Sequence, residues 1–158
     1  RLAAEGASLV LSDIDPTRSV LAAQLGARWL EPAEALRAEV DVLAPCALGG
    51  VLDHALAVEL RCAIVCGSAN NQLASDEVAD TLADRDILYA PDFIVNSGGL
   101  INVSLELTGY DRDLAMDRVE QIEPVMDEIL RHAERASITP LAAAVEVAQA
   151  RLLGSAQA

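Results

Sequence analysis

The sequence predicts an α/β fold with a Rossmann-like, doubly wound parallel sheet covered by helices. Short apolar segments of strand character alternate with segments of helical periodicity along the first two thirds of the chain. Three consecutive apolar segments end in turns of small residues, as strands do where an open α/β sheet binds ligands. Hydrophobic residues make up 53% of the chain and aromatic residues only 3%, so the core must consist mainly of aliphatic side chains.

The expected elements follow from local signals along the first two thirds. Arg1 to Glu5 have the pattern of a helix end that Gly6 terminates. Asp15 and Pro16 are a typical helix start, and Gly26 ends that helix. Further helices are expected to begin at Pro32, to span 54–60, and to run from a cap at Ser75 to Asp84. The strands, the first of them buried, are expected at 8–12, 27–30, 40–44, 63–66 and 87–90.

The last third of the sequence is helical in pattern. Apolar residues recur at steps of three and four over 111–133, which predicts one long helix with a single apolar stripe: Ala115, Val119, Ile122, Met126, Ile129 and Ala133. Thr139 and Pro140 start a final helix that reaches about 152, and 154–158 is expected to be disordered. We therefore divide the chain into a Rossmann-like domain over 1–110 and C-terminal helices with a tail over 111–158.

The glycine-rich loop of a dinucleotide-binding fold is missing from these 158 residues. Such a fold opens with a strand, a Gly-x-Gly-x-x-Gly loop and a helix, whereas this sequence starts where that helix would end. The first strand is central in the order 3-2-1-4-5-6, so its loss would leave two open sheet edges. We expect a truncated gene product, a proteolysed piece or the ordered part of a longer chain. Expressed alone, these residues are expected to be inactive and poorly soluble.

The turns after the predicted strands carry the residues suited to bind a ligand. Paired glycines at a helix start, such as Gly98 and Gly99, let a ligand approach the backbone and meet free N–H groups. Asn96 stands just before them and offers both a donor and an acceptor. An ordinary strand-to-helix turn is the alternative for this segment taken alone. The Gly49–Gly50 pair and the amides at 70 and 71 end the two preceding strands in the same way, which favours a ligand site.

Four motifs resemble the leucine/valine/phenylalanine dehydrogenases, a family in the glutamate dehydrogenase superfamily. They are Pro45–Gly50 (PCALGG), Gly67–Ala74 (GSANNQLA), Ile87–Asp92 (ILYAPD) and Asn96–Val103 (NSGGLINV). The resemblance extends from Gly6 to about Arg151 and is to the C-terminal, NAD-binding half of such an enzyme. It implies NAD-dependent oxidative deamination of an apolar L-amino acid, leucine, valine, isoleucine or phenylalanine, in a cytoplasmic homo-oligomer.

The resemblance also implies roles for individual residues. Cys46 and Ala47 would lie beside the adenosine and its ribose, as would Leu48. Ser68, Ala69 and Asn70 would contact the nicotinamide ribose and carboxamide, and Asn96 would lie beside the nicotinamide and the substrate amino group. Leu100 and Val103 would line the pocket for the substrate side chain, although ordinary helix core is an alternative for these two.

Asp13 is expected to select the cofactor, because it ends the second strand of the fold. A carboxylate there accepts hydrogen bonds from the adenosine ribose hydroxyls and repels a 2′-phosphate, which favours NAD over NADP. The alternative is that Asp13 or Asp15 only caps the following helix. Asp15 occupies the better cap position and leaves Asp13 available for the ribose.

Some residues depart from the family pattern. Ser68 and Ser97 stand where alanine is usual, and Asp53 where asparagine is common. Asp86 stands where glycine is common, so it must take a left-handed backbone conformation there. These differences bear on affinity and not on the class of enzyme.

No catalytic residue is assigned within these 158 residues. All eleven basic residues are arginine, which stays protonated and cannot act as a general base near neutral pH. The resemblance places the catalytic lysines and aspartate in an N-terminal domain that this sequence does not contain. A non-catalytic nucleotide-binding or oligomerisation module is one alternative function. A glutamate dehydrogenase is another, less favoured because Leu100 and Val103 offer no basic partner for a side-chain carboxylate.

Charge and cysteine content limit the possible partners. A net charge of −14 argues against binding nucleic acid or an anionic membrane surface, and no apolar run is long enough to span a bilayer. Cys46, Cys62 and Cys66 lack the spacing of a disulfide framework or a metal site, which fits a reducing cytoplasm. We expect no metal, and we expect all three thiols to be small buried side chains.

Overall fold

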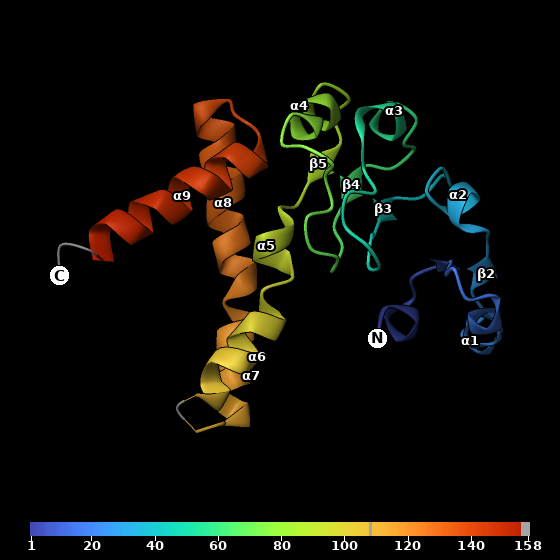
Figure 1. The fold of residues 1–158 in the computed structure, drawn as a ribbon, viewed down its shortest axis with the longest axis horizontal. Coiled ribbons are helices and arrows are strands. Elements are labelled where there is room, and N and C mark those ends of the chain that lie inside the picture. Colours follow the sequence, from blue (N-terminus) through green and yellow to red (C-terminus); the bar gives the residue numbers. More distant parts are fainter. Residues whose placement is uncertain (108, 156–158) are drawn as a thin grey trace. The chain divides into compact units, whose positions relative to one another are not determined.

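The computed structural model describes residues 1–107 and 109–155, which divide into two compact units, Arg1–Val40 and Asp41–Ala158 (Figure 1). Each unit contains a sheet, and every pair of strands in these sheets is parallel. The expected α/β class with parallel strands is confirmed. Along the sequence, the two compact units are divided between residues 40 and 41. The expected domain boundary at residue 110 is a separate matter and stays a prediction.

The first unit is built around two short parallel strands. A 3₁₀ turn η1 (Leu2–Glu5) precedes β1 (Val10–Leu11), and a 3₁₀ turn η2 (Pro16–Arg18) leads into α1 (Ser19–Gln24). β2 (Arg28–Trp29), which carries the sole tryptophan of the sequence, pairs with β1, and α2 (Pro32–Ala35) follows. β1 is half-buried and not buried as expected, because a two-stranded sheet in a unit of this size has little to cover it.

Local signals in the first unit act as the sequence predicts. Gly6 ends η1 with a φ of 92°, and Gly26 follows α1 with a φ of 64°, both in the left-handed region that glycine adopts without strain. The Asp15 carboxylate caps η2 by accepting the Thr17 N–H at 2.9 Å, and the Thr17 hydroxyl donates to it as well. These hydrogen bonds lower the pKa of Asp15.

The second unit holds a three-stranded sheet in the order β3-β4-β5. The strands are β3 (Val42–Leu43), β4 (Ile64–Val65) and β5 (Leu88–Tyr89), and the register aligns Val42 with Ile64 and Ile64 with Leu88. Backbone hydrogen bonds extend the pairing on both sides, for instance from Ala90 N to Val65 O at 2.9 Å. All three strands lie inside the ranges that the sequence predicts.

Two short helices connect these strands. α3 (His54–Ala57) is capped by Asp53, whose carboxylate accepts the Leu56 N–H at 2.7 Å. α4 (Val78–Ala83) begins three residues after Ser75. The Ser75 carbonyl, and not its side chain, accepts the Val78 N–H, so the expected side-chain cap is wrong.

Five helices follow β5: α5 (Asp92–Val95), α6 (Gly98–Glu106), α7 (Arg112–Glu120), α8 (Ile122–Ala136) and α9 (Pro140–Ser155). The paired glycines open α6 as expected. The prediction of a single long helix over 111–133 is wrong, because the helix is interrupted at Gln121, between α7 and α8. Pro124 explains the break, since it has no N–H to donate to Glu120 O and its ring would collide with that carbonyl.

The part of the apolar stripe that lies on α8 packs as a core. Ile129 and Ala133 of α8 are buried together with Ala143 and Ala144 of α9, and Met126 lies against them. α9 packs across α8, and α8 also packs against α5, which follows the last strand directly (Figure 1). α9 extends to Ser155, so helix covers part of the expected disordered tail; the remainder, 156–158, lies outside the described residues.

Candidate functional site

Three loops that follow β3, β4 and β5 meet in the second unit. Backbone hydrogen bonds join the loop after β4 to the loop after β3, among them Ala69 N to Pro45 O at 3.0 Å and Gly50 N to Asn71 O at 2.6 Å. Parallel strands place their carboxyl ends at one edge of the sheet, which is where ligands bind in open α/β folds. The sequence motifs PCALGG and GSANNQLA therefore lie side by side.

Two glycines permit this close approach. A Cβ atom on Gly67 would overlap the backbone nitrogen, carbon and oxygen of Pro45. One on Gly49 would overlap the carbonyl oxygens of Asn70 and Asn71. Neither glycine has a positive φ, so glycine is required here by space and not by backbone conformation.

Asn70 and Asn96 lie in direct contact, as expected for residues that share one site. Asn96 Nδ2 donates to Asn70 Oδ1 at 2.7 Å, and it also approaches Ala69 O at 3.4 Å. Within residues 1–107 and 109–155, neither Asn70 Nδ2 nor Asn96 Oδ1 makes a further hydrogen bond. One free donor and one free acceptor therefore lie together at the end of the sheet.

The remaining strand-end candidates differ in exposure. Ser68, Cys46 and Ala47 are exposed and accessible to a ligand, whereas Ala69 is buried. The Ala69 N–H donates to Pro45 O, and its carbonyl accepts from two side-chain amides, so its backbone polar groups are already engaged. Ala69 thus acts as an anchor of the loop.

The thiols do not all have the expected environment. Cys46 is exposed, so the expectation of a buried side chain is wrong for it. Its position in the loop beyond the end of β3 leaves the side chain without covering elements. Cys62 and Cys66 flank β4 and are half-buried, and burial raises the pKa of both thiols. In the described parts of the chain, no three His, Cys, Asp or Glu residues gather as metal ligands would.

Two buried polar residues at this site were not among the sequence candidates. Gln72 is fully buried, and its Nε2 donates to Gly67 O at 2.7 Å and to Ala69 O at 3.0 Å. Asp92, also buried, accepts the Gln72 N–H at 2.9 Å and the Phe93 N–H at 2.7 Å. Both residues lie inside the quoted motifs, but only Asp92 carried a signal, as a charged residue within an apolar stretch.

A buried tyrosine lies close to this pair. Tyr89 of β5 is almost completely buried, and burial together with the neighbouring Asp92 carboxylate raises the pKa of Tyr89 to about 12. The phenol therefore stays neutral at physiological pH, so it adds no second negative charge beside Asp92.

Leu100 and Val103 are exposed on α6. Their exposed fractions are 74% and 55%, so they are not part of a core formed by the described residues. The next apolar residue on this helix face, Leu107, is 86% exposed. The face is thus available to a substrate side chain or to other protein.

Asp13 belongs to the other compact unit. It follows β1, it is exposed, and its Oδ1 accepts the Asp15 N–H at 2.9 Å. Its Oδ2 makes no hydrogen bond with the part of the chain that the structure describes. Asp15, and not Asp13, caps the helical turn, as expected. One carboxylate oxygen of Asp13 is therefore available to a ribose hydroxyl.

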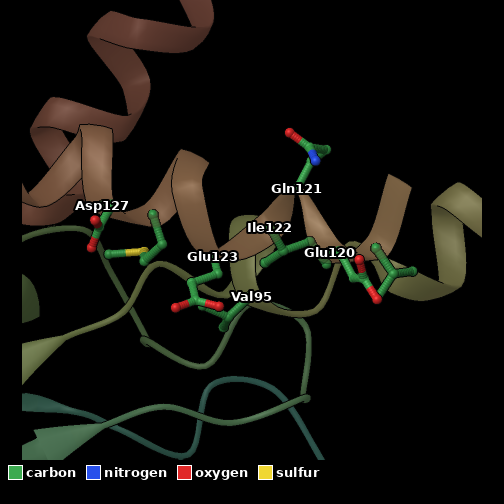
Figure 2. A pocket seen from close by; sticks show the side chains of 8 residues that line it. Val95, Glu120, Gln121, Ile122, Glu123 and Asp127 are labelled. Carbon is green, nitrogen blue, oxygen red and sulfur yellow. The ribbon is translucent and has the colours of Figure 1, made fainter. Parts of the chain in front are cut away.

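A separate pocket of about 820 Å³ lies at the junction of α7 and α8 (Figure 2). Its apolar wall comes from Val95 of α5 and from Ile122 and two further side chains of α7 and α8. Carboxylates of Glu120, Glu123 and Asp127 also line it. None of the site residues expected from the sequence lines this pocket, so it is distinct from the strand-end site.

The fold and this site define an α/β protein in which loops that follow parallel strands are hydrogen-bonded to one another and carry asparagine side chains. Over residues 11–157 the chain matches the family model described as Glutamate/Leucine/Phenylalanine/Valine dehydrogenase. The chain belongs to this family of amino-acid dehydrogenases.

Several named relatives match nearly the whole chain. Leucine dehydrogenase of Bacillus cereus is 39% identical over 152 residues, which cover 96% of this chain and 42% of that protein. Valine dehydrogenase of Streptomyces albus is 42% identical over 155 residues, which cover 96% of this chain and 43% of that protein. The chain thus spans less than half the length of these curated relatives.

Two solved structures of amino-acid dehydrogenases are similar to this chain. The crystal structure of L-tryptophan dehydrogenase from Nostoc punctiforme superposes with a TM-score of 0.93 at 37% identity, over 97% of this chain and 47% of that one. A hetero-hexameric glutamate dehydrogenase from Thermus thermophilus gives a TM-score of 0.65 at 22% identity, over 93% of this chain and 46% of that one, a likeness of fold alone. No helix in the described residues is both long and apolar enough to cross a membrane.

Proposed function

We propose that this chain is the NAD-binding half of an enzyme that oxidatively deaminates an apolar L-amino acid. The observation that carries the proposal is the Asn70–Asn96 pair, in which Asn70 lies in the loop after β4 and Asn96 ends the short helix α5 that follows β5. A nicotinamide carboxamide has one donor group and one acceptor group. The free Asn70 Nδ2 and the free Asn96 Oδ1 are complementary to it.

The chain's own residues would bind and orient the reactants. NAD, when bound, supplies the acceptor for a hydride from the substrate Cα. Asn70 and Asn96 would hold the carboxamide and so fix which face of the ring meets the substrate. Exposed Ser68 would contact the nicotinamide ribose, Cys46 and Ala47 would lie beside the adenosine, and Leu100 and Val103 would contact the apolar substrate side chain. The general base that activates water would come from outside these 158 residues.

The test is an assay of the full-length gene product. NAD reduction is measured with leucine, valine, isoleucine, phenylalanine, tryptophan and glutamate, together with release of ammonia. Activity on an apolar amino acid supports the proposal. NADH binding without any deamination would favour a non-catalytic nucleotide-binding module, and a preference for glutamate would contradict the apolar pocket. Sedimentation of the same sample tests the proposed homo-oligomer.

Replacing Asp13 tests the choice of cofactor. In the full-length enzyme, Asp13→Ala is expected to weaken NAD binding about tenfold or more, because a hydrogen bond to a charged group contributes about 1.5–3 kcal/mol. The same change should narrow the preference for NAD over NADP, since the carboxylate no longer repels a 2′-phosphate. Titration with both cofactors measures these effects.

Asp15→Ala is the matched control for this prediction. Asp15 caps η2 and is exposed like Asp13, so its loss removes a nearby carboxylate without removing the proposed ribose contact. The ratio of NAD to NADP affinity should stay as it is in the unaltered enzyme. Full rejection of NADP by Asp13→Ala would argue against Asp13 as the ribose ligand.

Replacing Val103 tests the substrate pocket. Val103→Lys is expected to raise kcat/KM for glutamate relative to leucine by about tenfold or more, because an ammonium group would pair with the side-chain carboxylate. The exposed position accepts a lysine without disturbing the core. Ser104→Lys adds the same charge at the neighbouring exposed residue of α6 and should leave the substrate ratio unchanged. An equal shift in both variants would contradict a specific pocket contact.

A further inference from the structure

We propose that Gln72 is a positioning residue for the nicotinamide end of the cofactor, acting through the carbonyl oxygen of Ala69. This inference rests on the proposed function. It assigns a role to a side chain that is fully buried and is therefore shielded from direct contact with the cofactor.

Gln72 and Asn96 share one acceptor, the carbonyl oxygen of Ala69. Ala69 O accepts from Gln72 Nε2 at 3.0 Å and lies 3.4 Å from Asn96 Nδ2. The same Asn96 nitrogen donates to Asn70 Oδ1 at 2.7 Å. A continuous set of hydrogen bonds therefore joins the buried Gln72 amide to both asparagines that would hold the carboxamide.

Two hydrogen bonds fix the orientation of the Gln72 side-chain amide. Nε2 donates to two carbonyl oxygens, those of Gly67 and Ala69, in the loop after β4. The opposite orientation would point the amide oxygen at these two oxygens and lose both hydrogen bonds. The Gln72 backbone is held as well, because its N–H donates to the buried Asp92 carboxylate at 2.9 Å.

This arrangement costs stability, because it leaves one buried acceptor unsatisfied in the part of the chain that the structure describes. Gln72 Oε1 is buried and has no hydrogen-bond partner within the described residues, and an unsatisfied buried acceptor destabilises the fold. An apolar side chain of similar size would avoid this cost but could not hold the two carbonyls. The donors of Gln72 therefore serve the geometry of the loop.

The test compares two ligands of the full-length enzyme. NADH carries the nicotinamide group, whereas ADP occupies only the adenosine end of the same site. Gln72→Met keeps the length of the side chain and removes its donors. It is expected to weaken NADH binding about tenfold, as the loss of two neutral hydrogen bonds implies, and to leave ADP affinity within about twofold.

Leu82→Ala is the matched control, because it destabilises the second unit at a fully buried residue of α4 whose carbonyl accepts the Ile87 N–H just before β5, at the end of the sheet opposite to the strand-end loops. It should leave the affinities for NADH and ADP as they are in the unaltered enzyme. If Gln72→Met weakens both ligands equally, its role is general support of the fold and the inference is wrong. Unchanged NADH affinity would also overturn it.

A second variant covers the case in which Gln72→Met does not fold. Gln72→Glu introduces a carboxyl group of the same length at a buried position beside two carbonyl oxygens, surroundings that favour the protonated form. The protonated group can donate to Gly67 O or Ala69 O. NADH affinity relative to the unaltered enzyme should therefore recover as the pH falls from about 8 to about 6. A constant ratio across this range would overturn the inference.

The outcome also separates this inference from the function on which it rests. If the unaltered enzyme binds NADH and deaminates an apolar amino acid while Gln72→Met binds NADH normally, only the role of Gln72 is wrong. If the unaltered enzyme binds no NADH, the proposed function and the role of Gln72 fail together.

Discussion

Gly67→Ala is expected to destabilise the second unit by about 3 kcal/mol or more and to abolish measurable NADH binding. The added methyl group would overlap three backbone atoms of Pro45. Overpacking of a well-packed site costs about 1–3 kcal/mol when side chains can move aside, and backbone atoms can move less. To remove this overlap, the loops after β3 and β4 would have to separate. Their separation would break the hydrogen bond from Ala69 N to Pro45 O. Urea unfolding and NADH titration measure the two effects.

Gly99→Ala is the control for this prediction. Gly99 is near the start of α6, its φ is not positive, and a Cβ there would meet no atom within 4 Å. Alanine restricts the unfolded chain and favours helix, so the variant should be unchanged or more stable by up to about 1 kcal/mol. If Gly67→Ala unfolds at the same urea concentration as Gly99→Ala, the close approach of the two loops is wrong.

Asp92→Ala is expected to cost about 3 kcal/mol or more of unfolding free energy. The buried carboxylate accepts the backbone N–H groups of Gln72 and Phe93, and each hydrogen bond to a charged group contributes about 1.5–3 kcal/mol. Its removal leaves the buried Gln72 N–H without an acceptor. Thermal and urea unfolding of the variant and the unaltered protein measure the loss.

Asp111→Ala separates the effect of burial from the effect of hydrogen bonding. Asp111 caps α7 and accepts two backbone N–H groups, from Asp113 at 2.9 Å and Leu114 at 3.1 Å, but it is exposed. Water replaces the carboxylate there, so the expected cost is about 1 kcal/mol. Equal losses in the two variants would show that burial does not set the contribution of Asp92.

Features set by a few neighbouring residues could be predicted from the sequence. Asp15 caps η2, Gly6 and Gly26 take positive φ, and Asp86 has the left-handed φ of 56° expected where glycine is common. The α/β class also followed from the alternation of strand and helix patterns. These signals are local, so a single sequence contains them.

Features that depend on distant residues could not be predicted in the same way. The break between α7 and α8 is different, because Pro124 was a local signal for it that the continuous apolar stripe outweighed in the prediction. The exposure of Cys46 depends on which elements cover the end of β3. The contact between Asn70 and Asn96 was expected only as common membership of one site, because their hydrogen bond spans 26 residues.

The position of the tryptophan gives the two compact units separate optical signals. Trp29 lies on β2 of the first unit, and it is the only tryptophan in these 158 residues, whereas Tyr89 is buried in the second unit. Selective excitation of the indole in this segment therefore reports the environment of residues 1–40. Of the two tyrosines in these 158 residues, Tyr89 lies in the sheet and is buried whereas Tyr110 is exposed, so the tyrosine signal in near-ultraviolet dichroism reports mainly the sheet of the second unit. Unfolding followed with both chromophores would reveal whether the units melt together or in turn.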